Sequence, residues 1–219
     1  MRTHARAVII GGGAMGVGLL YHLAKEGWKD VVMVEKGELT SGSTWHAAGL
    51  IPHFIGSLNM AKIHFYGSDL YKKLENETGQ ATGWHGCGAI RLAIDQDQVD
   101  WFHYVKGVLD QVGAECHLLG PDEIKKVHPL LETEGFLMGA YTTGDGHTDP
   151  SGATQAMAVG ARSNGAEIYL NNRVTDTNLL PSGEWEVITE KGSIICEHLV
   201  NAAGSFCEQV GMMAGIKVP

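Results

Sequence analysis

The chain has 219 residues, of which 44% are hydrophobic and 19% charged, an ordinary balance for a globular protein with a large core. Its formal net charge of −9 argues against a nucleic-acid partner, because such partners are recognised by basic patches. No stretch approaches the roughly 20 apolar residues of a membrane-spanning helix, and the four cysteines lack the close spacing of a metal site. We therefore expect reduced thiols at Cys87, Cys116, Cys196 and Cys207.

A strand and a glycine-rich turn open the predicted fold. The apolar run 8–10 has the length of a buried strand. In the G-x-G-x-x-G turn after it, the first glycine permits the tight turn, the second permits close approach of a pyrophosphate, and the third permits packing of helix on strand. These glycines are Gly11, Gly13 and Gly16. The helix expected from about Ala14 to Gly27 presents free N–H groups to a diphosphate at its start.

An acidic residue ends the second predicted strand. Residues 31–34 are apolar, and Glu35 follows them at the position where a ribose hydroxyl needs an acceptor. Strand, glycine turn, helix, strand and acid in this order predict a dinucleotide-binding domain. A carboxylate at Glu35 disfavours a 2′-phosphate, so NADP is the least expected ligand.

A loop of small residues at 40–43 then leads into the string T-W-H-A-A-G at 44–49. Small residues let the backbone run close against a flat ligand, whereas an NAD-binding domain usually continues with a plain β-α unit. The pattern favours FAD over NAD. An NAD-dependent dehydrogenase stays open as an alternative, and it predicts a colourless protein.

Residues 57–141 alternate between helical and strand patterns. The expected elements are a helix over 57–74 ending in a turn at 76–79, a strand at 88–94, a helix from about 96 to 112, a short helix from 121 to before 128, and a strand at 136–141. We interpret this section as the start of a substrate domain inserted into the nucleotide-binding fold.

A helix is expected from Asp149 to about Ser163, because an acid caps its start and Pro150 suits its first turn. The strands expected after it are 167–170, parallel to the first sheet, then a meander over 174–180, 185–189 and 194–196, and a last strand at 198–200. A helix beyond Gly204 carries Phe206, Val210 and Met213 on one side. Small residues at 202–204 let the backbone pass close to a cofactor or permit tight packing of helix on sheet.

Other polar residues are weaker candidates for binding sites. Asp145, His147 and Asp149 form an acid and histidine cluster, but the glycines and proline around them indicate a loop, so we predict no metal site. Arg91 could bind a substrate carboxylate through a bidentate contact, although a surface or interdomain arginine is the favoured interpretation. Three further histidines have no partner visible in the sequence: His53, His64 and His85.

Motifs spread over nearly the whole chain resemble those of the flavin-dependent dimethylglycine and sarcosine dehydrogenases, within the larger group typified by D-amino-acid oxidase. The string S-T-W-H-A-A-G-L at 43–50 is specific to this group. The other matching segments are 11–16, 34–36, 38–42, 144–150 and 201–204.

The resemblance implies an α/β fold with a Rossmann-like FAD-binding domain, made of a parallel central sheet and a β-meander. This domain is expected at 1–75 and 145–219, incomplete at its C-terminus, with the first part of an inserted α+β substrate domain at 76–144.

The resemblance also implies that FAD is bound covalently through an imidazole nitrogen of His46. A neutral imidazole is a nucleophile, which suits this role. Val174 is implied to offer its backbone to the adenine end of FAD. The implied cofactor-binding residues are Gly11, Gly13, Ala14, Met15, Gly16, Glu35, Lys36, Gly42, Ser43, Thr44, Trp45, His46, Ala47, Ala48, Gly49, Leu50, Val174, Ala203 and Gly204.

The implied reaction is oxidative N-demethylation of a methylated glycine, dimethylglycine or sarcosine, by hydride transfer from the N-methyl carbon to flavin N5. We interpret the chain as the N-terminal portion of such an enzyme, with its catalytic groups, and any tetrahydrofolate site, beyond Pro219. An incomplete FAD-binding subunit that needs a partner chain is the other alternative. The electron acceptor is not identifiable. The compartment is expected to be the bacterial cytoplasm, or the mitochondrial matrix if the protein is eukaryotic with its transit peptide removed.

Overall fold

The computed structural model describes residues 1–218, which form two compact units. Unit 1 comprises Met1–Ala48, Leu74–Thr82 and the described residues from Asp149 onward. Unit 2 comprises Gly49–Lys73 and Gly83–Thr148. No helix within residues 1–218 is long and apolar enough to cross a membrane.

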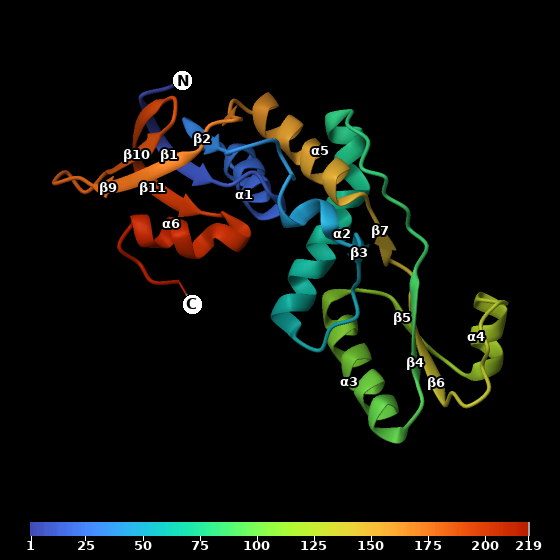
Figure 1. The fold of residues 1–219 in the computed structure, drawn as a ribbon. Coiled ribbons are helices and arrows are strands. Elements are labelled where there is room, and N and C mark those ends of the chain that lie inside the picture. The colour runs from blue at the N-terminus through green and yellow to red at the C-terminus, as the bar shows by residue number, and fades with distance from the viewer. Residues whose placement is uncertain (219) are drawn as a thin grey trace. The chain divides into compact units, whose positions relative to one another are not determined.

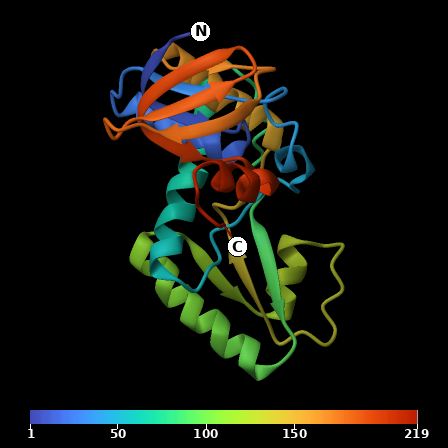
Figure 2. The same cartoon turned by 60° about the vertical axis from the view of Figure 1, so that its left-hand side comes forward.

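Unit 1 contains a six-stranded sheet in the order β8-β2-β1-β11-β10-β9. Figures 1 and 2 show this sheet in two orientations. The strands are β1 (His4–Ile10), β2 (Val31–Val34), β8 (Glu167–Tyr169), β9 (Val174–Leu179), β10 (Trp185–Thr189) and β11 (Gly192–Asn201). The first four in this order pair in parallel, and the last two pair antiparallel as a meander. The predicted Rossmann-like fold with a meander is therefore confirmed.

One strand differs from the prediction. The two separate strands expected at 194–196 and 198–200 are a single strand, β11. Its residues Ile195 and Cys196 pair antiparallel with β10 on one side and parallel with β1 on the other. Pairing with β10 ends at Cys196, whereas pairing with β1 continues to Asn201, so the backbone stays extended across the predicted break.

Helices cover both faces of this sheet. The face formed by Val8, Ile10, Val32 and Val34 packs with residues of the meander and of α6 (Cys207–Met213), including Val210. The opposite face meets α1 (Ala14–Lys25), which packs in turn against α5 (Pro150–Ser163), as Figure 1 shows. As predicted, α5 begins with Asp149, whose carboxylate accepts hydrogen bonds from the N–H groups of residues 151 and 152.

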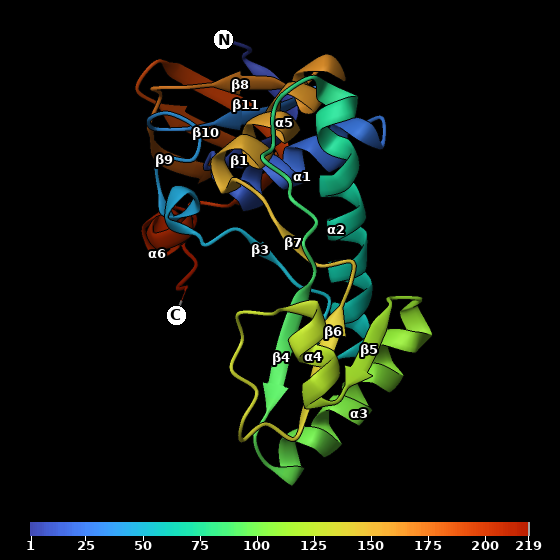
Figure 3. The same cartoon turned by 90° about the vertical axis from the view of Figure 1, so that its right-hand side faces the viewer.

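Unit 2 contains an antiparallel sheet in the order β4-β6-β5, made of β4 (Ala89–Ala93), β6 (Met138–Thr142) and β5 (Cys116–Leu119). Ala140 belongs to the core that the sheet shares with α3 (Gln96–Val112), whereas its neighbour Gly139 contacts Ile124 of α4 (Pro121–Val127). Because successive strand residues point to opposite faces, the two helices cover opposite faces of the sheet (Figure 3).

Three strands of unit 2 were not predicted. These are β5 and the two-residue pair β3 (Leu50–Ile51) and β7 (Gly146–His147). In addition, β6 begins and ends later than the predicted 136–141. Such short strands exist through their pairing partners, which local sequence patterns do not reveal.

The helix α2 (Leu58–Thr78) continues through the turn that was predicted at 76–79. Gly79, with φ of +72°, follows its last turn in the left-handed conformation that commonly ends helices. The extra turn holds Glu77, whose carboxylate is bound by side chains of α1. This tertiary contact explains why the helix extends beyond the end that the sequence pattern predicts.

Candidate nucleotide-binding groove

A groove of about 460 Å³ lies in unit 1 at the carboxyl ends of β1, β2 and β11. The strand order places β2 on one side of β1 and β11 on the other. In open α/β sheets, ligands bind where the chain leaves the central strand in opposite directions. Twelve predicted site residues line the groove: Gly11, Gly13, Ala14, Met15, Glu35, Lys36, Gly42, Ser43, Thr44, Val174, Ala203 and Gly204.

The three glycines of the turn have different surroundings. Gly11 has φ of +114°, and a Cβ atom there would lie 2.4 Å from the carbonyl oxygen of Ala202. A Cβ atom on Gly16 would lie 2.0 Å from the carbonyl oxygen of Gly11. A Cβ atom on Gly13 would have only the Thr44 hydroxyl within 4 Å, at 3.1 Å. Packing thus requires Gly11 and Gly16, whereas Gly13 leaves its space open to the groove.

The loop after β2 reaches the start of α1. The Ala14 N–H donates a hydrogen bond of 3.0 Å to the Thr44 hydroxyl, since the N-cap residue Gly13 offers no side chain. This contact brings the small residues Gly42 and Ser43 to the groove beside the helix N-terminus. Backbone N–H groups and the helix dipole make this end of the groove suitable for an anion.

Glu35 fixes the glycine turn as well as lining the groove. Its side chain is buried, and its carboxylate accepts hydrogen bonds from the N–H groups of Gly12, at 2.6 Å, and Gly37, at 2.8 Å. Each oxygen engages one backbone donor, and a carboxylate offers about four acceptor positions. Glu35 therefore keeps acceptor capacity for a hydroxyl group.

Sequence reasoning missed part of the groove wall. Phe206 stands on it, and the Lys36 ammonium lies 3.2 Å from the centroid of the Phe206 ring. Phe206 was expected only as an apolar residue on one side of a helix, which gives no sign of a place on the groove. The other lining residues that were not predicted to bind the cofactor are Ile10, Gly12, Val34, Thr40, Ser41, Arg173, Ala202, Ser205, Gln209, Val210 and Met213.

His46 lies outside the lining of the groove. It ends the 3₁₀ helix η1 (Ser43–His46), is exposed, and lies with its ring 3.7 Å from that of Trp45, centroid to centroid. Its Nδ1 lies 3.2 Å from the carbonyl oxygen of Gly42. The other predicted residues that do not line the groove are Gly16, Trp45, Ala47 and Ala48 in unit 1, and Gly49 and Leu50 in unit 2.

The acid and histidine cluster of Asp145, His147 and Asp149 makes contacts that hold the loop together. Asp145 accepts a hydrogen bond of 2.8 Å from the backbone N–H of His53, and Asp149 caps α5. His147 pairs through its backbone with His85. Within residues 1–218 no group of three or more potential ligands could hold a metal ion.

Arg91, His64 and the cysteines are the remaining candidate residues. The Arg91 guanidinium lies 5.0 Å from the centroid of the Phe54 ring, and His64 lies 2.7 Å from the carbonyl oxygen of Pro52. Burial raises the pKa of the Cys196 thiol to about 11, so this thiol is a poor nucleophile.

Comparison with known proteins gives consistent matches. The family model described as "FAD dependent oxidoreductase" matches residues 6–219. The chain is 46% identical over 218 residues to "Dimethylglycine dehydrogenase, mitochondrial" of Homo sapiens, covering 100% of this chain and 25% of that protein. It is 35% identical over 221 residues to "Sarcosine dehydrogenase, mitochondrial" of Homo sapiens, covering 98% of this chain and 24% of that protein.

A solved structure shares the fold. The crystal structure of L-proline dehydrogenase from P. horikoshii superposes with a TM-score of 0.91 at 29% identity, covering 100% of this chain and 58% of that one. The chain therefore spans about a quarter of the length of the two dehydrogenases named above and over half of the solved one.

Proposed function

Because this chain belongs to the family of FAD-dependent oxidoreductases, we propose that its groove holds FAD and that the protein oxidises a small methylated glycine, dimethylglycine or sarcosine. The observation that carries the proposal is the open space at Gly13 beside the start of α1, with the Glu35 carboxylate in the same groove. Similarity to dimethylglycine and sarcosine dehydrogenases supports the choice of substrate class.

The residues of the groove fit the parts of FAD. A diphosphate suits the N–H groups at the start of α1, where the backbone at Gly13 is open to the groove. A ribose hydroxyl suits the Glu35 carboxylate, and the apolar side chains Val174, Val210 and Met213 suit a purine base. We propose that unit 1 is the FAD-binding domain and that unit 2 is the first part of a substrate domain.

Bound FAD would supply the oxidation by accepting at N5 the hydride of the substrate N-methyl carbon. The protein's own part is to bind the cofactor and orient it. The substrate is left as an iminium, which water or tetrahydrofolate captures as a one-carbon unit. For the compartment we propose the bacterial cytoplasm or the mitochondrial matrix.

We include covalent attachment at His46 in this proposal. A carbonyl oxygen only accepts hydrogen bonds, so the contact of Nδ1 with Gly42 requires the proton on Nδ1. The neutral ring then carries its lone pair on Nε2. This tautomer makes Nε2 the nitrogen expected to bond to the flavin 8α-methyl group.

Acid precipitation tests the attachment. We expect flavin fluorescence to stay with the denatured pellet of the full chain, and to appear in the supernatant for His46→Ala. The matched control is His103→Ala, which removes an exposed histidine on α3 and should retain the flavin. Flavin released from the wild type would contradict covalent attachment while leaving the FAD site in place.

Anaerobic reduction of the bound flavin tests the reaction. We expect dimethylglycine or sarcosine to bleach the flavin absorbance, and glycine, which has no N-methyl group, to leave it unchanged. A colourless wild-type protein that takes up no FAD would contradict the whole proposal. Bleaching by glycine would contradict N-demethylation as the reaction, and it would leave the proposed FAD site in place.

A further inference from the structure

A contact between Lys36 and Phe206 crosses the groove. Lys36 follows β2 and Glu35, whereas Phe206 ends the 3₁₀ helix η2 (Gly204–Phe206) that follows β11. In the sheet, β2 and β11 flank β1 on opposite sides. The ammonium of Lys36 lies 3.2 Å from the centroid of the Phe206 ring, and both residues line the groove. This pair therefore joins the two walls above the end of β1.

The loop that carries Phe206 is held by several hydrogen bonds. The Asn201 side chain accepts from the N–H of Ala203 at 3.2 Å and donates to the carbonyl of Cys207 at 2.8 Å. The N–H of Phe206 donates to the carbonyl of Ala203 at 3.0 Å. These contacts restrict the backbone on both sides of Phe206, which lines the groove.

Within residues 1–218, the structure gives no other evident reason for the positions of the Lys36 and Phe206 side chains. Phe206 keeps 43% of its surface exposed, which is high for a phenylalanine. Within residues 1–218, Lys36 takes part in no ion pair that the structure shows. An ammonium over an aromatic face is attracted by the ring, more strongly when a ligand excludes water from the pair.

We propose that Lys36 and Phe206 form a strap that retains the adenosine half of the dinucleotide in the groove. This inference rests on the proposed FAD site. The adenosine half is the one concerned because Lys36 directly follows Glu35, the proposed ribose acceptor, and Val174 lies in the same groove. A strap of this kind slows release of the ligand more than it changes the rate of binding.

A simpler role for Lys36 makes a different prediction. Its charge alone could attract the diphosphate, without Phe206. In that case, loss of the lysine and loss of the ring would act independently and their effects would multiply. If the two side chains act as one strap, removing the second adds little once the first is gone.

The test uses the full chain carrying His46→Ala and freed of flavin, because covalently bound FAD would occupy the groove. Its ligand is ADP, which carries the adenosine and diphosphate of FAD without the flavin ring. Dissociation of fluorescently labelled ADP from the full chain is measured for Lys36→Met, Phe206→Leu and the double variant. We expect each single change to raise the dissociation rate about three- to tenfold, and the double variant to match the larger single effect.

The controls separate the strap from other causes. Lys29→Met removes an exposed lysine that does not line the groove and should leave the rate unchanged. Lys36→Arg keeps a cation that can lie on the ring and should release ADP as slowly as the wild type. Thermal unfolding without ligand checks that each variant is folded, as expected for exposed side chains.

Unchanged rates in both single variants, or effects that multiply in the double variant, overturn the strap and leave the FAD site standing. A wild-type chain that binds neither ADP nor FAD overturns the proposed function itself, and the strap with it. These two failures are therefore distinguishable.

Discussion

At the scale of single residues, the glycines of the turn have different roles, one in folding and another in ligand binding. The space around Gly16 is closed by backbone, since a Cβ atom there would lie 2.0 Å from the carbonyl oxygen of Gly11. The space at Gly13 is limited only by the Thr44 hydroxyl at 3.1 Å. The two glycines therefore have different functions although they belong to one motif.

We predict that Gly16→Ala lowers the free energy of unfolding by about 2–3 kcal/mol or prevents folding, because backbone cannot yield to the methyl group. Gly13→Ala should fold almost normally but bind FAD at least about tenfold more weakly, because its methyl group enters the groove. Urea unfolding and flavin fluorescence titration measure the two effects.

Gly18→Ala in α1 is the matched control, since its Cβ atom would meet only the Met157 sulfur, at 3.9 Å. It should stabilise the helix by up to about 1 kcal/mol and leave FAD binding unchanged. A Gly13→Ala protein that binds FAD as tightly as the wild type would contradict the assignment of this groove.

A buried histidine gives unit 2 a predicted sensitivity to acid. His53 is 2% exposed; its Nε2 lies 2.7 Å from the Ser68 hydroxyl and its Nδ1 lies 3.4 Å from the Asp145 carboxylate. Burial lowers the pKa of His53, and Lys72 and His64 lower it further, whereas Asp145 opposes them. The folded protein therefore favours the neutral ring.

The sign of the pH effect follows from this shift. Because the pKa of His53 is lower in the folded protein than the usual value near 6.5, the unfolded chain takes up the proton first as pH falls. The contribution of His53 is complete above that value and is lost at lower pH. We expect the free energy of unfolding to fall between about pH 7.5 and about pH 5.5, and to fall less in His53→Gln.

The comparison requires a histidine without this burial. His103→Gln removes an exposed imidazole on α3 and should keep the wild-type pH dependence. Urea unfolding at each pH supplies the free energies. Equal pH dependence in His53→Gln and the wild type would show that His53 does not carry the effect.

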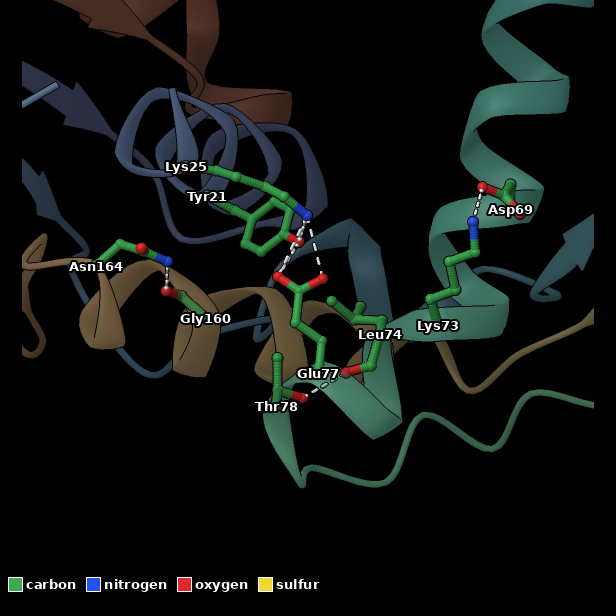
Figure 4. A network of polar contacts seen from close by, with 9 residues as sticks. All are labelled: Tyr21, Lys25, Asp69, Lys73, Leu74, Glu77, Thr78, Gly160 and Asn164. Carbon is green, nitrogen blue, oxygen red and sulfur yellow. Dashed lines mark hydrogen bonds and ion pairs between the residues drawn. The ribbon is translucent and has the colours of Figure 1, made fainter. Parts of the chain in front are cut away.

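At the scale of helices, a polar network joins α1 to the last turns of α2 within unit 1 (Figure 4). The hydroxyl of Tyr21, which is fully buried, donates to Glu77 at 2.7 Å. Lys25 donates to the Tyr21 hydroxyl at 2.7 Å and to the Glu77 carboxylate at 3.1 Å. The Tyr21 ring also packs against Gly160 of α5, where a Cβ atom would lie 2.7 Å from it.

We predict that Tyr21→Phe lowers the free energy of unfolding by about 1–2 kcal/mol, because Lys25 and Glu77 both lose the hydroxyl between them. Figure 4 also shows the matched control, the ion pair of Asp69 with Lys73 on the exposed side of α2. Lys73→Ala should cost no more than about 0.5 kcal/mol. Similar losses in both variants would contradict a special contribution of the network.

The same network shows where sequence patterns stop being informative. The helices α1, α3 and α5 were predicted well because apolar spacing and, in α5, the capping residue Asp149 act within the helix itself. The final turn of α2 and the strands β3, β5 and β7 were missed. They depend on partners far along the chain, and single-sequence patterns contain no information on such pairing.

Among the residues that line the groove, some were predicted from local motifs and others were not. Gly11, Gly13 and Glu35 were predicted because each satisfies a requirement of a motif, and all three line the groove. Phe206 was missed because its role depends on Lys36, which is 170 positions away by number and adjacent only after β2 and β11 flank β1. The covalent role of His46 stays a prediction, since it depends on a bond to the cofactor.

At the scale of the whole chain, the family match covers residues 6–219 and therefore includes sequence from both compact units. The groove nevertheless belongs to unit 1 alone. Its walls come from three stretches, at 10–15, 34–44 and 173–213. They form one site because β11 returns to pair with β1, which makes this pairing a condition for any nucleotide binding.

That pairing has a consequence for biosynthesis. His4 of β1 lies opposite Ile195 of β11, so the first strand leaves the ribosome long before its neighbour is made. At about 5–20 residues per second the delay is roughly 10–40 s, during which one edge of β1, with its apolar run at 7–10, is unpaired. The nascent chain is thus exposed to aggregation throughout this interval, and chaperones that shield apolar segments of nascent chains should raise the yield of folded protein.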